Sequence, residues 1–218
     1  MYEAIVHGDQ AKRLIHIKDW LITKRQQTAG CPVCEQVLLV KAPNSPTVNT
    51  HFSHEKNSGC PLTAEAGKAF ERFTKTERVS AAEAARVKQY ALENIESIYY
   101  RAKDVCPELM WTEFLSLLEK ASQHNIWAFK DFNTGYLPYV LLCCAELFLG
   151  KRGSNRPHSV FFVLEPEASK SEFWHLPAGV KQRVWRVDVS TGICDVILMK
   201  LDEADPWYRT KAKAILKI

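Results

Sequence analysis

The feature that most constrains this chain is a group of cysteine and histidine residues between positions 31 and 60. Cys31 and Cys34 are separated by two residues and are followed by His51, His54 and Cys60. A Cys-x-x-Cys pair can reach one ion from a tight turn, and Zn²⁺ binds four thiolate or imidazole donors in a tetrahedron. The spacing therefore predicts a zinc site made of four of these five residues. A Cys-Cys-His-Cys set would leave His51 outside the coordination sphere, but the spacing alone does not select the four.

Two other interpretations of the cysteine pair are weaker. In the first, the cysteines are buried thiols and the histidines lie on the surface, but a Cys pair followed by His and Cys at this spacing seldom occurs without a metal. In the second, the pair is a redox motif. A thioredoxin-type pair opens a helix after a buried strand, whereas the polar run Lys24-Arg25-Gln26-Gln27 precedes this one.

The same segment resembles the N-terminal zinc-ribbon region of the competence protein CoiA-like family. The resemblance covers about residues 1–62 and rests on Cys-Pro-x-Cys, the extended run 37–41 and the His51-Phe52-Ser53-His54 step. It implies a bacterial or phage setting in DNA uptake, mobile elements or defence. In that family the ribbon is joined to a restriction-type nuclease domain, so the rest of the chain has to be compared with that expectation.

The chain departs from a restriction-type nuclease at a residue that the chemistry requires. Such a centre needs a carboxylate at the end of one strand and an acid-x-Lys triplet on the next, because the carboxylates hold the metal that activates water. Asp188 and Lys200 approach this pattern, with Glu65 as a further acid, but Leu198 occupies the position of the second carboxylate. We therefore expect no nuclease activity, and a divergent metal-dependent nuclease is the alternative.

Charge adds a second expectation about partners. The formal net charge is +4, which by itself does not indicate nucleic-acid binding, but the basic residues are clustered. Such clusters can follow a phosphate backbone, although solvated Lys and Arg side chains are the common case. The candidate nucleic-acid contacts are Lys24, Arg25, Lys151, Arg152, Arg156, Lys181, Arg183 and Arg186.

Hydrophobic patterning predicts an α+β chain with two domains. Residues 1–62 form a small β ribbon held by zinc, with short strands over 2–6 and 14–17 joined through Gly8-Asp9, and a second strand pair over 37–41 and 48–52. Residues 63–218 form a mostly helical domain with a small C-terminal antiparallel sheet. It has helices over 63–150, strands over about 159–200 and a C-terminal helix over 205–216.

Within the helical part, Ser80-Ala81-Ala82-Glu83 is a capping box that should open one long helix through Ile98. Trp111 begins an amphipathic helix, and the apolar run 139–148 predicts a central one. Tyr99, Tyr100 and Trp111 are interpreted as core packing rather than base stacking. The carboxylates around Glu165 are interpreted as a solvated loop between strands.

Composition places the chain among ordinary globular proteins of the cell interior. It has 46% hydrophobic and 25% charged residues, no secretory signal and no apolar run long enough to cross a bilayer, so we expect a cytoplasmic protein without membrane partners. Seven cysteines, an odd number, favour a reducing compartment. Outside the metal cluster we expect buried, inert thiols at Cys106, Cys143, Cys144 and Cys194.

These observations favour a non-catalytic zinc protein that binds nucleic acid or a nucleoprotein complex. The nuclease described above is the first alternative. A protein–protein inhibitor or adaptor is the second.

Overall fold

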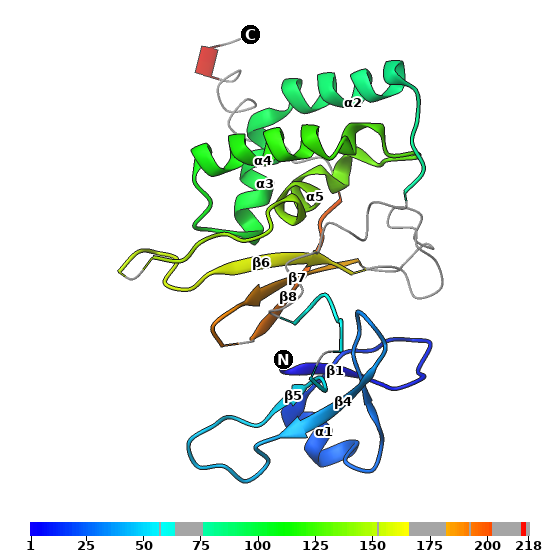
Figure 1. Cartoon of the computed structure of the whole chain (residues 1–218), viewed down its shortest axis with the longest axis vertical. Helices are drawn as coiled ribbons and strands as arrows, with labels where there is room; N and C mark the ends of the chain where they lie inside the picture. The colour runs from blue at the N-terminus through cyan, green and yellow to red at the C-terminus, as the bar shows by residue number, and fades with distance from the viewer. Residues whose placement is uncertain are drawn as a thin grey trace. The chain divides into compact units, whose positions relative to one another are not determined.

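The computed structural model describes residues 1–56, 58–63, 76–151, 153–165, 182–191, 193–201 and 215–216. The fold is α+β, as predicted, with antiparallel sheets and a set of helices (Figure 1). The chain forms two compact units, one of Met1–Lys75 with Ala145–Leu198 and the other of Thr76–Cys144 with Met199–Ile218.

The first unit contains a five-stranded antiparallel sheet in the order β2-β1-β3-β4-β5. Its strands are β1 (Glu3–Val6), β2 (Ile15–His16), β3 (Ala29–Gly30), β4 (Val37–Lys41) and β5 (His51–Ser53). The pairing of β1 with β2 and of β4 with β5 agrees with the predicted hairpins. The predicted second strand is shorter than expected because Ile17 opens helix α1 (Ile17–Thr23), whose first turn is capped by the His16 side chain.

A second antiparallel sheet in the same unit has the order β6-β7-β8. It comprises β6 (Val160–Leu164), β7 (Arg183–Asp188) and β8 (Cys194–Leu198). Every residue of β6 is buried, as expected for a continuous apolar strand. The β7–β8 hairpin was also predicted, and its register places Arg186 opposite Asp195.

One apolar core in the first unit includes side chains of both sheets. Trp20 and Phe52 from the N-terminal part pack edge to face with their ring centres 5.5 Å apart. The same cluster contains Phe161 of β6 and Trp185 of β7. The predicted boundary at residue 62 therefore differs from the division into units. The C-terminal strands group with the N-terminal β module, because this shared core buries the apolar face that neither could bury alone.

The second unit is helical. It contains α2 (Ala81–Glu93), α3 (Ile95–Val105), α4 (Trp111–Gln123) and α5 (Leu137–Cys144), with short 3₁₀ turns η3 (Ile126–Ala128) and η4 (Thr134–Tyr136). The predicted capping box at Ser80 and Glu83 is present. The predicted long helix is instead two helices, because the backbone leaves helical geometry at Asn94. Helix α5 is buried along its whole length and packs against α3 and α4.

Several predictions fall outside the described residues. They are the helix after Thr63 and all of the C-terminal helix except residues 215–216, which are helical. None of the helices in the described segments combines the length and hydropathy that a membrane crossing requires.

Candidate metal centre

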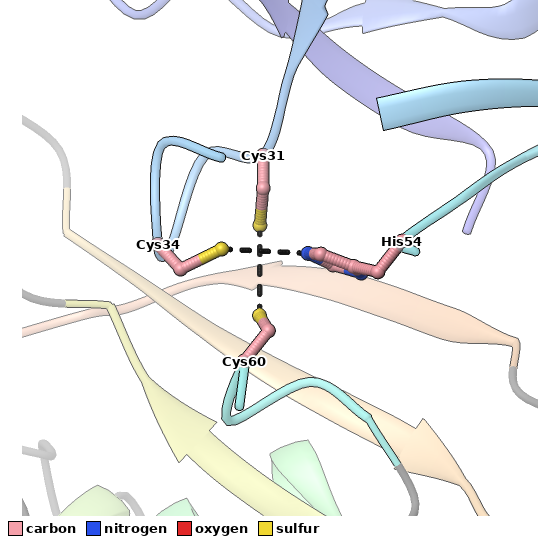
Figure 2. Close-up of side chains that lie close together, drawn as sticks. All are labelled: Cys31, Cys34, His54 and Cys60. Atoms are coloured by element: carbon pink, nitrogen blue, oxygen red, sulfur yellow. Dashed lines mark hydrogen bonds between the residues drawn. The ribbon is translucent and has the colours of Figure 1, made fainter. Parts of the chain in front are cut away.

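Four of the five predicted donors meet in the first unit. The side chains of Cys31, Cys34, His54 and Cys60 point toward a common centre (Figure 2), and their ligand atoms all lie within 4.8 Å of one another. Cys31 directly follows β3, His54 directly follows β5, and Cys34 and Cys60 lie in the loops beyond. Strand pairing through β4 thus brings together donors that lie up to 29 residues apart.

The first two donors are positioned by a tight turn of the backbone. The Glu35 amide donates to the carbonyl oxygen of Cys31 at 2.9 Å, and the Cys31 amide donates to that of Gln36 at 2.9 Å. Glu35 closes the turn with φ 61°, a left-handed conformation. The Val33 amide donates to Cys31 Sγ at 3.4 Å. The turn therefore aims a thiol inward and supplies a hydrogen bond that favours its ionised form.

Cys60 lies in a turn that repeats this arrangement. The amide two residues onward, that of Leu62, donates to Cys60 Sγ at 3.4 Å, and the Thr63 amide donates to the Cys60 carbonyl at 2.9 Å. Gly59 immediately before it has φ 66°, which glycine adopts without steric cost. Two similar turns therefore present thiols to the same centre.

The distances between donors fit a tetrahedral zinc ion. With Zn–S near 2.3 Å and Zn–N near 2.0–2.1 Å, an ideal tetrahedron separates two sulfurs by about 3.8 Å and a sulfur from a nitrogen by about 3.6 Å. The Sγ atoms of Cys31 and Cys60 are 3.8 Å apart, and Cys34 Sγ lies 3.4 Å from His54 Nε2. Four protein donors leave no coordination position for water, which is the arrangement of structural rather than catalytic zinc. The cluster can therefore hold a metal ion.

Proximity of the three thiols changes their acidity in opposite directions. The hydrogen bond between Cys31 and Cys34 raises the pKa of Cys31 to about 12. Hydrogen bonds from Cys31 and Cys60 lower the pKa of Cys34, and the contact with Cys31 raises the pKa of Cys60. The cluster by itself thus favours a single thiolate, and holding three thiolates together near neutral pH requires a cation between them.

His51 lies outside this group. It belongs to β5, and its Nδ1 lies 2.9 Å from the Asn49 carbonyl oxygen. The spacing in the sequence left His51 and His54 as competing ligands, and the structure brings His54 to the cysteines. The deciding factor is the end of β5 at Ser53, after which the chain turns toward Cys34 and Cys60.

Asp188, one residue of the nuclease alternative, has hydrogen-bond partners within its own turn. Asp188 accepts hydrogen bonds from the Ser190 amide at 2.9 Å, the Ser190 hydroxyl at 2.7 Å and the Thr191 amide at 2.9 Å, and His158 Nδ1 lies 2.7 Å away. Desolvation opposes ionisation of Asp188, but these hydrogen bonds outweigh it and lower the pKa of Asp188 to about 2. Its carboxylate therefore organises the β7–β8 turn.

The other two residues of that alternative are Lys200 and Glu65. Lys200 belongs to the second unit, where its amide donates to the Tyr139 hydroxyl at 2.8 Å, whereas Asp188 belongs to the first. Glu65 lies outside the described residues. Among the residues that the structure describes, the Cys31 cluster is the one grouping of three or more cysteine, histidine and acidic side chains with metal-binding geometry.

Two of the predicted nucleic-acid contacts have interactions within the chain. Arg156 is only 6% exposed, and its guanidinium lies 5.1 Å from the centre of the Phe148 ring. Arg183 forms an ion pair with Glu165 at 3.1 Å. Lys24 and Arg186 are half-buried, Arg25 and Lys151 are exposed, and Arg152 and Lys181 lie outside the described residues.

Sequence reasoning missed the role of Glu165. The predicted solvation is wrong for Glu165, which is only 5% exposed and accepts a hydrogen bond from Trp185 Nε1 at 2.9 Å in addition to its pairing with Arg183. Glu167 and Glu172, the other carboxylates of that prediction, lie outside the described residues. Glu165 directly follows the apolar strand β6, and that position was the available signal of burial.

The aromatic residues were predicted to be core. Tyr99 does pack edge to face on Trp111 at 4.7 Å, but Tyr100 is 57% exposed and Trp111 is 40% exposed. The prediction of burial is therefore wrong for these two residues.

The remaining cysteines are buried, as predicted. Desolvation raises the pKa of Cys194 to about 11 and raises that of Cys144 as well, which keeps both as neutral thiols.

No protein-family model, curated protein or solved structure matches this chain. The similarity of the N-terminal region to CoiA-like proteins therefore stays a prediction from the residues quoted above. The centre is assigned from its donors and their geometry.

Proposed function

We propose that this chain is a zinc protein in which one Zn²⁺, bound by Cys31, Cys34, His54 and Cys60, holds the first unit together as a non-catalytic binding module. The observation that carries the proposal is the group of four donors within 4.8 Å of one another, two of whose separations match those of a tetrahedral zinc site. Two of the sulfurs belong to the apolar core, because Cys31 and Cys60 are buried within the same cluster as Trp20 and Trp185. The ion would therefore stabilise packing, since no site remains on it for a substrate.

The proposed partner is nucleic acid or a nucleoprotein complex. Lys24 and Arg25 support it, because they lie in the turn between α1 and β3 that leads into Cys31. The exposed rings of Tyr100 and Trp111 also support it, since exposed aromatic rings stack on bases. The similarity to CoiA-like proteins is consistent with DNA handling in bacteria or phages.

Metal analysis of the purified protein tests the first part of the proposal. We expect about one zinc per chain and its loss in the Cys31→Ser/Cys60→Ser double variant. Cys106→Ala, which removes a buried cysteine of the second unit, is the control and should keep its zinc. Protein without stoichiometric zinc after growth in zinc-replete medium would contradict the proposal.

A salt-dependent titration with DNA and RNA tests the second part. Lys24→Ala/Arg25→Ala should weaken binding and reduce the slope of log affinity against log salt by about 1–2, because up to two phosphate contacts are lost. The control is Arg86→Ala/Lys88→Ala, which removes two exposed charges from α2. Equal losses in both variants would contradict this placement of the contact. Failure to bind either nucleic acid at low salt would favour the protein adaptor.

Plasmid nicking with magnesium or manganese tests the claim that the protein is non-catalytic. We expect no cleavage, because Asp188 is committed to a turn. Cleavage that disappears in Asp188→Ala would reject the claim.

A further inference from the structure

A cavity of about 550 Å³ lies in the first unit beside the metal centre. Three of its lining residues, Phe52, Leu62 and Cys194, are apolar and buried. Half-buried His51 contributes to the walls, and exposed Lys56 lies among the lining residues. This volume falls within the range of small-ligand sites, about 300–1,000 Å³.

The metal ligands fix two sides of this cavity. His54 both lines the cavity and faces the cluster through Nε2. Leu62 is held by its amide hydrogen bond to the sulfur of Cys60, and its carbonyl accepts a hydrogen bond from the Cys194 thiol at 3.9 Å. The ion would therefore hold the segment after β5 and the segment after Cys60 at the separation that leaves the cavity between them.

The lining combines apolar side chains with polar groups. A carbonyl oxygen only accepts hydrogen bonds, so the contact between His51 Nδ1 and the Asn49 carbonyl places the proton of neutral His51 on Nδ1 and leaves Nε2 as an acceptor. Imidazole also offers a ring face on which bases stack. A planar ring with apolar faces and polar edges suits such a lining.

The charged residues that line the cavity indicate where a phosphate would lie. Exposed Lys56 supplies a cation, and exposed Glu55 supplies an opposing carboxylate. An anionic group is therefore favoured on the Lys56 side of the opening, with the ring directed toward Phe52 and Leu62.

We propose that this cavity binds one nucleotide unit, with its base against His51 and its phosphate at Lys56, and that the metal centre assembles the site. This inference rests on the proposed function and gives it a location. The nucleotide is either one residue of a single strand or a free mononucleotide, and the two sources share the same chemistry.

The test measures binding of a fluorescein-labelled oligothymidine decamer by anisotropy, and of thymidine and adenosine monophosphates by calorimetry. His51→Ala should weaken binding about 5- to 100-fold, the usual consequence of losing a stacked base. Lys56→Ala should weaken it and flatten the salt dependence. Lys41→Ala is the matched control, since Lys41 is exposed on β4 opposite His51 but does not line the cavity. Zinc content is measured for each variant, which separates loss of the site from loss of the fold.

Weakened decamer binding in His51→Ala and Lys56→Ala with zinc retained supports the site for a single strand, and the same pattern with mononucleotides alone supports a free nucleotide. Decamer binding that is unchanged in both variants overturns the cavity while leaving the proposed function in place. Failure of the wild-type protein to bind the decamer, the mononucleotides, duplex DNA and RNA overturns both the cavity and the proposed nucleic-acid partner.

Discussion

The two units of this chain stabilise their cores by different means. In the second unit, helix α5 is buried throughout, and α3 and α4 pack against it with apolar side chains. In the first unit, strands β2 and β3 have two residues each, and the buried cluster includes the sulfurs of Cys31 and Cys60. Such short strands supply few backbone hydrogen bonds, so a bound ion has more to contribute there than among the helices.

Removal of the metal should have the largest effect on the stability difference between the two units. Chelation, or the Cys31→Ser/Cys60→Ser variant, should destabilise the first unit strongly, since structural zinc contributes about 10–16 kcal/mol of apparent binding free energy. Hydrogen exchange should accelerate in β4 and β7 and stay slow in α5. The fluorescence of Trp20 and Trp185, both buried, should shift toward that of exposed tryptophan. Equal loss of protection in both units would show that the contrast is wrong.

The reciprocal test weakens the second unit alone. Phe114 is fully buried and packs against Tyr99 and Trp111 at ring separations of 5.3 and 5.4 Å, so Phe114→Ala should cost about 3–5 kcal/mol by leaving a cavity. Denaturant unfolding measures this loss, while zinc content should not change. Leu115→Ala, at the exposed neighbouring position, is the control and should have little effect. A fall in zinc content in Phe114→Ala would contradict independent stabilisation.

A third test asks how much of the first unit is stabilised without the metal. Glu165→Ala leaves Arg183 and the Trp185 indole N–H without this acceptor in a buried setting, which should cost about 3 kcal/mol. Glu165→Gln keeps an oxygen acceptor and should cost less. Thermal unfolding of the zinc-loaded protein measures both. If neither variant lowers the unfolding temperature, Glu165 contributes nothing and the metal accounts for more of the stability.

The smallest expected effect comes from the β7–β8 turn. Asp188→Ala removes the acceptor of three hydrogen bonds from Ser190 and Thr191 and should cost about 1 kcal/mol. Asp195→Ala, at an exposed position of the same hairpin, should change stability by a few tenths of a kcal/mol or less. Unfolding midpoints of the two variants provide the comparison. A larger loss of stability in Asp195→Ala than in Asp188→Ala would show that Asp188 does not stabilise the turn.

Much of the local structure was predictable because it depends on near neighbours. Ser80 and Glu83 form the predicted capping box, and the β7–β8 hairpin was evident from two apolar runs around a short turn. The prediction failed where distant residues decide the outcome. The place of Glu165 directly after β6 was a signal of burial, but its partners Arg183 and Trp185 arrive from β7, and no local pattern around Glu165 identifies them.

The candidate site also has one part that was predictable from the sequence and one part that was not. The spacing of Cys31 and Cys34 was enough to predict a metal-binding turn, and the later histidines and Cys60 supplied possible partners. The spacing alone did not distinguish His51 from His54. Their separation depends on where β5 ends and on the path to Cys60, and both are set by pairing with β4.

The sequence by itself determined the kinds of donor atom, their approximate grouping and the α+β class, since these follow from residue chemistry and short-range periodicity. Tertiary structure decided which histidine joins the cysteines and that β6–β8 share a core with the N-terminal strands. The first outcome depends on the pairing of β5 with β4, and the second on contacts between residues more than a hundred positions apart, such as Leu62 with Cys194. Pairings over that distance are selected by the fit of whole surfaces, which no local segment encodes.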